Sequence, residues 1–184
     1  MMQDRIGVFL SSRCDIDAAY LQATKDVGAW IGGRGLTLCY GGSRSGLMEI
    51  LAAEVKATGG RCLGVVPQII RDRQLVSEHL DIEMPCVDLS DRKAIMLREA
   101  DVFVALPGGI GTLDEVFTLL GNITIGLEHR KRMILYNVNG CWDTLVALLA
   151  DNVARGFAKH NVEQLVTVVS SVAELNEVFE AITR

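Results

Sequence analysis

The chain alternates short apolar runs with longer segments of helical periodicity from one end to the other. Such repeated strand–helix units predict an α/β fold: a Rossmann-like, doubly wound, mainly parallel sheet with helices on both faces. Strands are expected at residues 6–10, 36–40, 62–66, 101–106, 133–137 and 165–169, with a short one at 81–84 inside the irregular stretch 68–87. Helices are expected at residues 16–31, 45–58, 88–99, 113–127, 142–155 and 172–182.

Composition narrows the class of protein. The chain has 184 residues, 49% of them hydrophobic, and no linker or repeat, so residues 1–184 are expected to form a single domain. A net charge of −5 speaks against nucleic-acid and membrane partners, which require a basic face. No apolar run is long enough to span a membrane and no signal peptide is apparent, so a cytoplasmic location is expected.

The five cysteines never form a Cys-x-x-Cys pair. Cys39 and Cys62 belong to strand-like runs, which favours buried, reduced thiols over redox or metal roles. The histidines are scattered without metal-ligand spacing, so no metal site is predicted from His79, His129 and His160.

The most informative motif is the turn at residues 107–115, between the strand at 101–106 and the helix that follows. Its three glycines let backbone N–H groups approach an anion, and the helix N-terminus adds partial positive charge. Acids in a first helical turn also have a purely structural use, since they complement the dipole. The motif is neither the dinucleotide fingerprint G-x-G-x-x-G nor a P-loop. The expected phosphate contacts are Gly108, Gly109, Gly111 and Thr112, with Asp114 and Glu115 beside them.

A second glycine turn, Gly41-Gly42-Ser43, follows the strand at 36–40, and Ser11-Ser12 ends the first strand. Because ligands of parallel α/β sheets bind at the carboxyl ends of the strands, these segments are expected to meet in one crevice. Two such turns favour a phosphorylated ligand of nucleotide size, and hence a nucleotide-binding domain.

The helix at 88–99 carries Arg92, Lys93 and Arg98 and leads directly into the strand before the Pro-Gly-Gly turn. Basic residues on a helix usually form a solvated face, but this position favours contact with an anion. Arg98 lies six residues after Arg92 and on a different face from Lys93, so the three need not act together.

These segments resemble the LONELY GUY family, the cytokinin riboside 5′-monophosphate phosphoribohydrolases long mislabelled as lysine decarboxylases. The hallmark Pro-Gly-Gly-x-Gly-Thr-x-x-Glu stands at residues 107–115, and Arg-Lys-x-x-Met followed by Ala-Asp stands at 92–101. The family's Tyr-Gly-Gly-Gly-x-x-Gly-Leu-Met is approximated at 40–48, and Gly-Val-Val-Pro at 64–67 is similar to its Gly-Val-Ile-Pro. The similarity runs from about residue 5 to residue 160.

The resemblance implies hydrolysis of the N-glycosidic bond of a nucleoside 5′-monophosphate to free base and ribose 5-phosphate, with Arg98 and Glu115 as catalytic residues. Bond cleavage develops positive charge on the ribose, and a nearby carboxylate can stabilise that charge or activate water. A guanidinium can stabilise the departing base or hold the phosphate, and the sequence leaves both roles open for Arg98. No metal or organic cofactor is implied. The substrate-binding residues are expected to be Ser12, Gly41, Gly42, Ser43, Gln74, Arg92, Lys93, Gly108, Gly109, Gly111, Thr112 and Asp114.

Three departures from the family pattern leave the preferred base open. Ser43 replaces the third glycine of the second turn, and Gln74 replaces a substrate-contacting Glu, which removes a charge and adds a donor. The helix after Glu115 has the sequence Leu119-Leu120-Gly121-Asn122 in the region where the family usually has Thr-Trp. The base and its N6 substituent therefore need not be those of a cytokinin.

Other functions fit parts of the pattern. A general purine nucleotide (AMP) nucleosidase would use the same site, and a non-catalytic nucleotide or molybdenum-cofactor carrier would keep the glycine turns without needing both catalytic groups. A lysine decarboxylase would need a pyridoxal-phosphate lysine, which nothing near the turns supplies. A DNA-processing protein of related fold would need a basic face, contrary to the net charge.

A homodimer is also expected, because the helix at 113–127 is apolar on more than one face. In the outer layer of the fold, the apolar residues that face away from the sheet are expected to be buried against a helix of a partner subunit. The family resemblance implies the same. A two-fold contact would bring the helix that carries Arg98 to the border of the partner's pocket.

Overall fold

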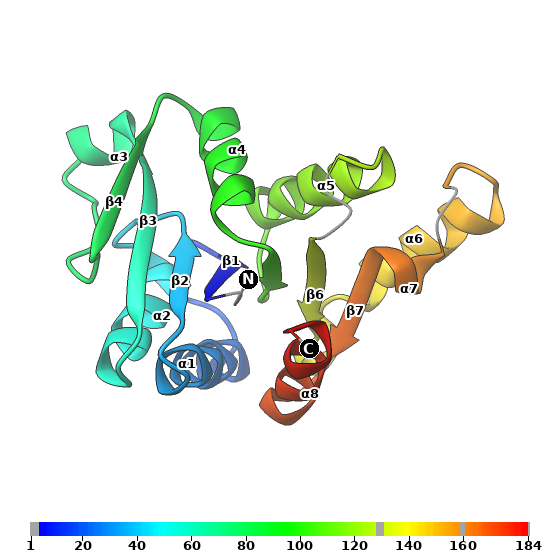
Figure 1. Cartoon of the computed structure of the whole chain (residues 1–184), viewed down its shortest axis with the longest axis horizontal. Coiled ribbons are helices and arrows are strands. Elements are labelled where there is room, and N and C mark those ends of the chain that lie inside the picture. The colour runs from blue at the N-terminus through cyan, green and yellow to red at the C-terminus, as the bar shows by residue number, and fades with distance from the viewer. Residues whose placement is uncertain (1–3, 128–130, 159–160, 184) are drawn as a thin grey trace.

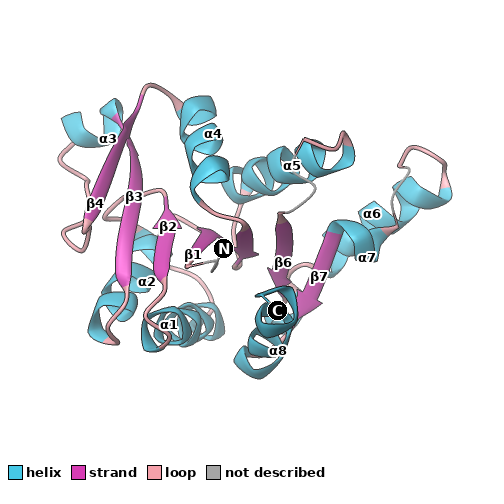
Figure 2. Cartoon of the chain, viewed as in Figure 1, coloured by secondary structure: helices cyan, strands magenta, loops and turns pink. Residues whose placement is uncertain are grey.

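The computed structural model describes residues 4–127, 131–158 and 161–183, and it contains one seven-stranded sheet (Figures 1 and 2). The strand order is β4-β3-β2-β1-β5-β6-β7, and every neighbouring pair is parallel. The α/β, Rossmann-like prediction is confirmed, with a sheet that is wholly rather than mainly parallel. The strands are β1 (Arg5–Phe9), β2 (Thr37–Tyr40), β3 (Arg61–Pro67), β4 (Ile82–Cys86), β5 (Val102–Ala105), β6 (Arg132–Tyr136) and β7 (Val166–Val169).

Helices cover both faces of the sheet (Figure 1). Each face has its own apolar core. Helices α1, α2 and α8 contribute to one core, which includes Val27, Leu51 and Leu175, while α4, α5 and α6 contribute to the other. The two layers arise because successive strand residues alternate between faces. The helices are α1 (Ala18–Gly33), α2 (Gly46–Ala57), α3 (Gln68–Asp72), α4 (Leu89–Glu99), α5 (Ile110–Thr124), α6 (Asp143–Ala154), α7 (Val162–Leu165) and α8 (Val172–Thr183), with a 3-10 turn at η1 (Val138–Gly140).

Two short helices, α3 and α7, were not predicted, because each has only one turn and therefore no readable periodicity. Helix α5 begins at Ile110, three residues earlier than expected at 113. The glycine turn therefore supplies the first helical turn itself, with Gly109 as its N-cap. Strand β4 extends to Cys86 and contains Pro85, which an edge strand tolerates because one of its sides needs no ladder hydrogen bond.

The direction of winding reverses between β1 and β5: the chain moves outward from β1 to β4, then from β5 to β7 on the other side. A crevice opens at the carboxyl ends of strands where such a reversal occurs. The backbone N–H of Ser11, after β1, donates to the carbonyl of Pro107, after β5, at 3.2 Å. The two strand ends are thus held together at this point. Among the described residues, no helix combines the length and apolarity needed to cross a membrane.

Candidate active site

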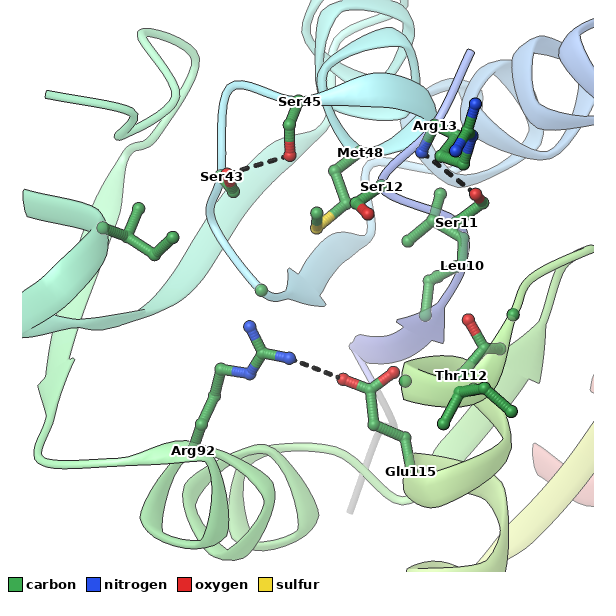
Figure 3. A pocket seen from close by; sticks show the side chains of 16 residues that line it. Leu10, Ser11, Ser12, Arg13, Ser43, Ser45, Met48, Arg92, Thr112 and Glu115 are labelled. Carbon is green, nitrogen blue, oxygen red and sulfur yellow. Dashed lines mark hydrogen bonds and ion pairs between the residues drawn. The ribbon is translucent and has the colours of Figure 1, made fainter. Parts of the chain in front are cut away.

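A cavity of about 350 Å³ lies at the carboxyl ends of β1, β2 and β5 (Figure 3). Its volume falls within the usual range of small-ligand pockets, about 300–1,000 Å³. Segments far apart in the sequence meet here as the parallel topology predicts. Of the residues expected from the sequence, the cavity is lined by Ser12, Gly41, Ser43, Arg92, Gly109, Gly111, Thr112 and Glu115.

One end of the cavity is formed by the first turn of α5. A Cβ added at Gly109 or Gly111 would meet nothing within 4 Å, so the space above this backbone is open. The first N–H groups of a helix have no partner within the helix, and the dipole makes this end partly positive. A side chain at Gly108 would instead collide with Thr112, which is 3% exposed. This arrangement suits an anion such as a phosphate.

The acid of the motif, Glu115, faces Arg92 across the cavity (Figure 3). Arg92 comes from α4, and its Nη2 lies 3.1 Å from Oε1 of Glu115. Glu115 is 8% exposed, and burial raises the pKa of its carboxyl group to about 7, against the opposing effect of Arg92. The buried Nε of Arg92 has no hydrogen-bond partner among the described residues. A buried acid with a pKa near neutrality, in contact with a permanent cation, is typical of a catalytic site.

The second glycine turn contributes in a different way, since its backbone is packed against the protein. A Cβ at Gly41 would come within 3.2 Å of both Arg92 and Met48. Gly42 adopts a φ of +66°, and its carbonyl accepts from the N–H of Ser77 at 2.9 Å. The hydroxyl of Ser43 is 3.0 Å from that of Ser45, and both residues line the cavity. The turn is therefore a wall of the cavity rather than an open anion site.

Several predicted substrate contacts lie outside the cavity lining. Lys93 Nζ is 2.7 Å from both carboxylate oxygens of Asp114, and Lys93 borders a groove between α4 and α5. Gln74 is exposed, and its backbone carbonyl accepts a hydrogen bond from the Arg44 guanidinium at 3.2 Å. Gly42, within the second turn, is buried, and Gly108 lines a neighbouring cavity with Gly109.

Arg98 does not join the cavity in this chain. Its side chain is 65% exposed, and its Nε lies 3.8 Å from Glu99. Arg92 and Arg98 are six residues apart in a helix of about 3.6 residues per turn, so they point to different sides. The geometry brings Arg92, rather than Arg98, to Glu115.

The cavity also includes residues that sequence reasoning did not select. Arg13 follows β1, and its place at a strand's carboxyl end was a signal that could have identified it. Ile70 had no such signal, because its helix α3 was not predicted. The other additional lining residues are Val8, Leu10, Ser45, Met48 and Ile110, and Ser11 lines the cavity as expected for the end of the first strand.

All five cysteines are free, and the predicted burial of Cys39 and Cys62 is confirmed. Cys39 and Cys62 are buried, and burial raises the pKa of each thiol to about 12. Within residues 4–127, 131–158 and 161–183, no three His, Cys, Asp or Glu side chains gather in a way that could hold a metal ion. The predictions for His129 and His160 concern residues outside the described ranges.

Fold and site together define a Rossmann-like α/β protein with an acid–guanidinium pair beside an anion cradle. The family model described as "Possible lysine decarboxylase" matches residues 48–179. A probable cytokinin riboside 5′-monophosphate phosphoribohydrolase of Oryza sativa subsp. japonica is 34% identical over 180 residues, 98% of this chain and 80% of that protein. A cytokinin riboside 5′-monophosphate phosphoribohydrolase of Arabidopsis thaliana is 32% identical over 177 residues, covering 96% and 77%. The chain belongs to the LONELY GUY family of cytokinin riboside 5′-monophosphate phosphoribohydrolases, and the resemblance to that family is confirmed.

Solved structures support the fold. The molybdenum cofactor binding protein of Rippkaea orientalis has a TM-score of 0.74 and 24% identity, over 100% of this chain and 99% of that one. The molybdenum cofactor carrier protein of Chlamydomonas reinhardtii has a TM-score of 0.69 and 24% identity, over 97% of each chain. Identity at this level shows a shared architecture and nothing about the ligand.

Proposed function

We propose that this protein hydrolyses the N-glycosidic bond of a nucleoside 5′-monophosphate, a cytokinin riboside or related nucleotide, to free base and ribose 5-phosphate. Residues 1–184 would form a single nucleotide-binding domain. The observation that carries the proposal is the contact between the buried Glu115 and Arg92, beside the open first turn of α5. The relatives named above as phosphoribohydrolases support the same reaction.

The substrate is anchored by its phosphate. Gly109, Gly111 and Thr112 line the cavity where the phosphate would bind, and the first N–H groups of α5 have no partner within the helix. Glu115 lies one turn further along α5, beyond Thr112, where the ribose would reach it. Binding the phosphate thus orients the ribose C1′ toward the acid before the reaction begins.

The bond between C1′ and the base nitrogen breaks with its electron pair leaving on the base. Glu115, as a carboxylate, stabilises the positive charge that develops on the ribose and accepts a proton from the attacking water, whose oxygen bonds to C1′. The Arg92 guanidinium stabilises the negative charge on the departing base, which then takes up a proton. A pKa of about 7 for Glu115 suits both acceptance and return of the proton near neutral pH.

In this proposal Arg92 takes the catalytic role that the family resemblance assigned to Arg98. Lys93 and Asp114 act at the border of the site, where their charges influence Glu115 without lining the cavity. No metal or organic cofactor takes part in the proposed steps.

A panel of nucleoside monophosphates, with base release measured by chromatography, tests the reaction. Adenine or an N6-substituted adenine should appear from the monophosphate, while adenosine should remain largely intact because it lacks the anchoring phosphate. Equal cleavage of nucleoside and monophosphate would contradict the assignment of the α5 turn. Preference for AMP over N6-substituted AMP would identify a general purine nucleotide nucleosidase.

A non-catalytic carrier is the second candidate, because molybdenum cofactor binding proteins have the same fold, although the fold alone does not identify a ligand. The paired Glu115 and Arg92 favour the enzyme over the carrier, because a carrier has no need of a buried acid with a pKa of about 7. Base release from any nucleotide of the panel would exclude a purely binding role.

We also propose a homodimer and a cytoplasmic location. The inner face of α5 is already covered by the sheet, through Val116, Leu119 and Leu120, so only its outer apolar residues call for a partner. Phe117 is 42% exposed and Ile125 is 71% exposed. Sedimentation should find a dimer that Phe117→Asp dissociates, and an active wild-type monomer at micromolar concentration would contradict the proposed dimer.

The proposed cytoplasmic location agrees with the cysteines, because five free thiols suit a reducing compartment.

A further inference from the structure

The charges of the cavity do not balance those of the proposed substrate. Of the described residues that line it, Arg13, Arg92 and Glu115 are the ones with ionisable side chains. Arg92 is engaged with Glu115 at 3.1 Å. A phosphate monoester carries a charge of about −1.5 to −2 at pH 7. The partial charge of a helix N-terminus, about +0.5, leaves most of it without a counterion.

Arg13 is the remaining cation of this cavity. It lines the main cavity together with Gly109, Gly111 and Thr112, and it also lines the adjoining cavity with Gly108 and Gly109. Arg13 therefore borders both cavities that adjoin the open turn of α5. Lys93, the other nearby candidate, is held by both carboxylate oxygens of Asp114 outside the cavity.

The backbone of Arg13 is held firmly in place. Its N–H donates to the hydroxyl of Ser11 at 3.0 Å, and the N–H of Ser11 donates to Pro107 at 3.2 Å. On the other side, Gly46 packs so closely against Ser12 and Arg13 that a Cβ at Gly46 would collide with their backbone. The position of the Arg13 Cα relative to the anion cradle is thus set by both glycine turns.

The side chain of Arg13, by contrast, is held among the described residues only by an exposed partner. Its Nε donates to Asp15 Oδ1 at 2.8 Å and its Nη2 to Oδ2, and the two side chains are 69% and 66% exposed. Exposed ion pairs contribute little to stability because solvent screens the two charges, so little free energy is needed to separate them. A guanidinium binds phosphate through two parallel hydrogen bonds, which are stronger when the site excludes water.

We infer that Arg13 is the counterion of the substrate's phosphate, exchanging Asp15 for the phosphate oxygens when the cavity fills. This inference rests on the proposed function, since it assumes a phosphorylated ligand in the cavity. Asp15 then acts as a competitor that holds the guanidinium while the cavity is empty. Arg13 is a binding residue here and takes no part in bond cleavage.

The test compares Arg13→Ala with Arg155→Ala. Arg155 makes a similarly exposed ion pair with Asp151 on α6, with side chains 65% and 52% exposed, and it lies outside the cavity lining. Both variants remove one positive charge, so a general electrostatic effect would appear in both. Binding of ribose 5-phosphate is measured by titration calorimetry, and hydrolysis of AMP by base release.

Arg13→Ala should weaken ribose 5-phosphate binding by about tenfold or more, the scale of a lost charge-assisted hydrogen bond. It should raise KM for AMP by a similar factor with little change in kcat, because the lost interaction acts equally on substrate and transition state. Arg13→Lys should retain part of the affinity. Asp15→Asn should tighten binding by about twofold, because it removes the competitor. Arg155→Ala should match the wild type.

The inference is overturned if Arg13→Ala binds ribose 5-phosphate as tightly as Arg155→Ala, or if the wild type does not bind it at all. A wild type that binds ribose 5-phosphate through Arg13 but releases no base from any nucleotide would contradict the proposed function and leave the inference standing. A loss of kcat without a change in binding would also contradict the inference. Circular dichroism of each variant verifies that the fold is retained.

Discussion

The two glycine-rich turns have similar sequences but opposite surroundings. At the turn before α5, the space next to Gly109 and Gly111 is empty, so the missing side chains leave room for a ligand. At the turn before α2, Gly41, Gly42 and Gly46 have protein atoms where a Cβ would lie. The glycine turn at α5 is thus suited to ligand binding and the turn before α2 to packing, because protein atoms already occupy the space next to the glycines of the second turn. Glycine in a strand-to-helix turn therefore does not by itself identify a phosphate site.

The largest expected effect comes from the acid on the helix that follows the open turn. Glu115→Gln should lower turnover by about 10²-fold or more, the scale of a positioned acid–base group, while leaving the fold and ligand affinity nearly unchanged. Asp114→Asn should do less, since Asp114 is exposed and paired with Lys93 outside the cavity. Steady-state base release measures both. Equal activity of Glu115→Gln and wild type would indicate a binding protein instead of an enzyme.

The packing role of the second turn predicts a large loss of stability. Gly46 has a φ of +52°, and a Cβ there would collide with the backbone after β1. Gly46→Ala should therefore lower the free energy of unfolding by about 2 kcal/mol or more, through left-handed strain and the collision together. Urea denaturation measures this change. A variant as stable as the wild type would remove the distinction between the two turns.

At the open turn of α5, the matching substitution Gly111→Ala should impair ligand binding rather than stability. Gly111→Ala places a Cβ in empty space within a helical turn, so stability should stay the same or rise by up to about 1 kcal/mol. The same Cβ narrows the approach of a phosphate to the backbone, and KM for the nucleotide should rise by about tenfold. Thermal unfolding and steady-state kinetics provide the two readouts. If Gly111→Ala kept its full affinity, the ligand would have to bind elsewhere in the cavity.

The smallest expected effect is a displacement of the pH profile. Glu115 works as a carboxylate in the proposed mechanism, so kcat/KM should fall as pH drops below its pKa of about 7. Burial sets this pKa, Asp114 raises it and Lys93 lowers it. The midpoint should therefore move to lower pH in Asp114→Asn and to higher pH in Lys93→Gln. Shifts in the same direction in both variants would show that neither charge acts on Glu115 directly.

Much of the architecture follows from local patterns in the chain. Apolar runs such as the one at 101–106 and helical segments such as the one at 142–155 predicted a parallel sheet covered on both faces, because buried strands and amphipathic helices each leave a period in the sequence. The same patterns placed the Pro-Gly-Gly turn at the carboxyl end of a strand. One-turn elements such as α3 were beyond this reasoning, since a single turn has no period to detect.

The sequence by itself determined the fold class, the family and the segments that supply the site. Which side chains meet there was decided by tertiary structure. The spacing of Arg92, Lys93 and Arg98 on one helix did not reveal which of them reaches Glu115, because that depends on how α4 packs beside α5. Nor could the two glycine turns be told apart, since the neighbours of Gly41 and Gly46 come from α4 and from the loop after β1. Contacts between distant segments depend on the packing of whole elements, which no local sequence pattern records.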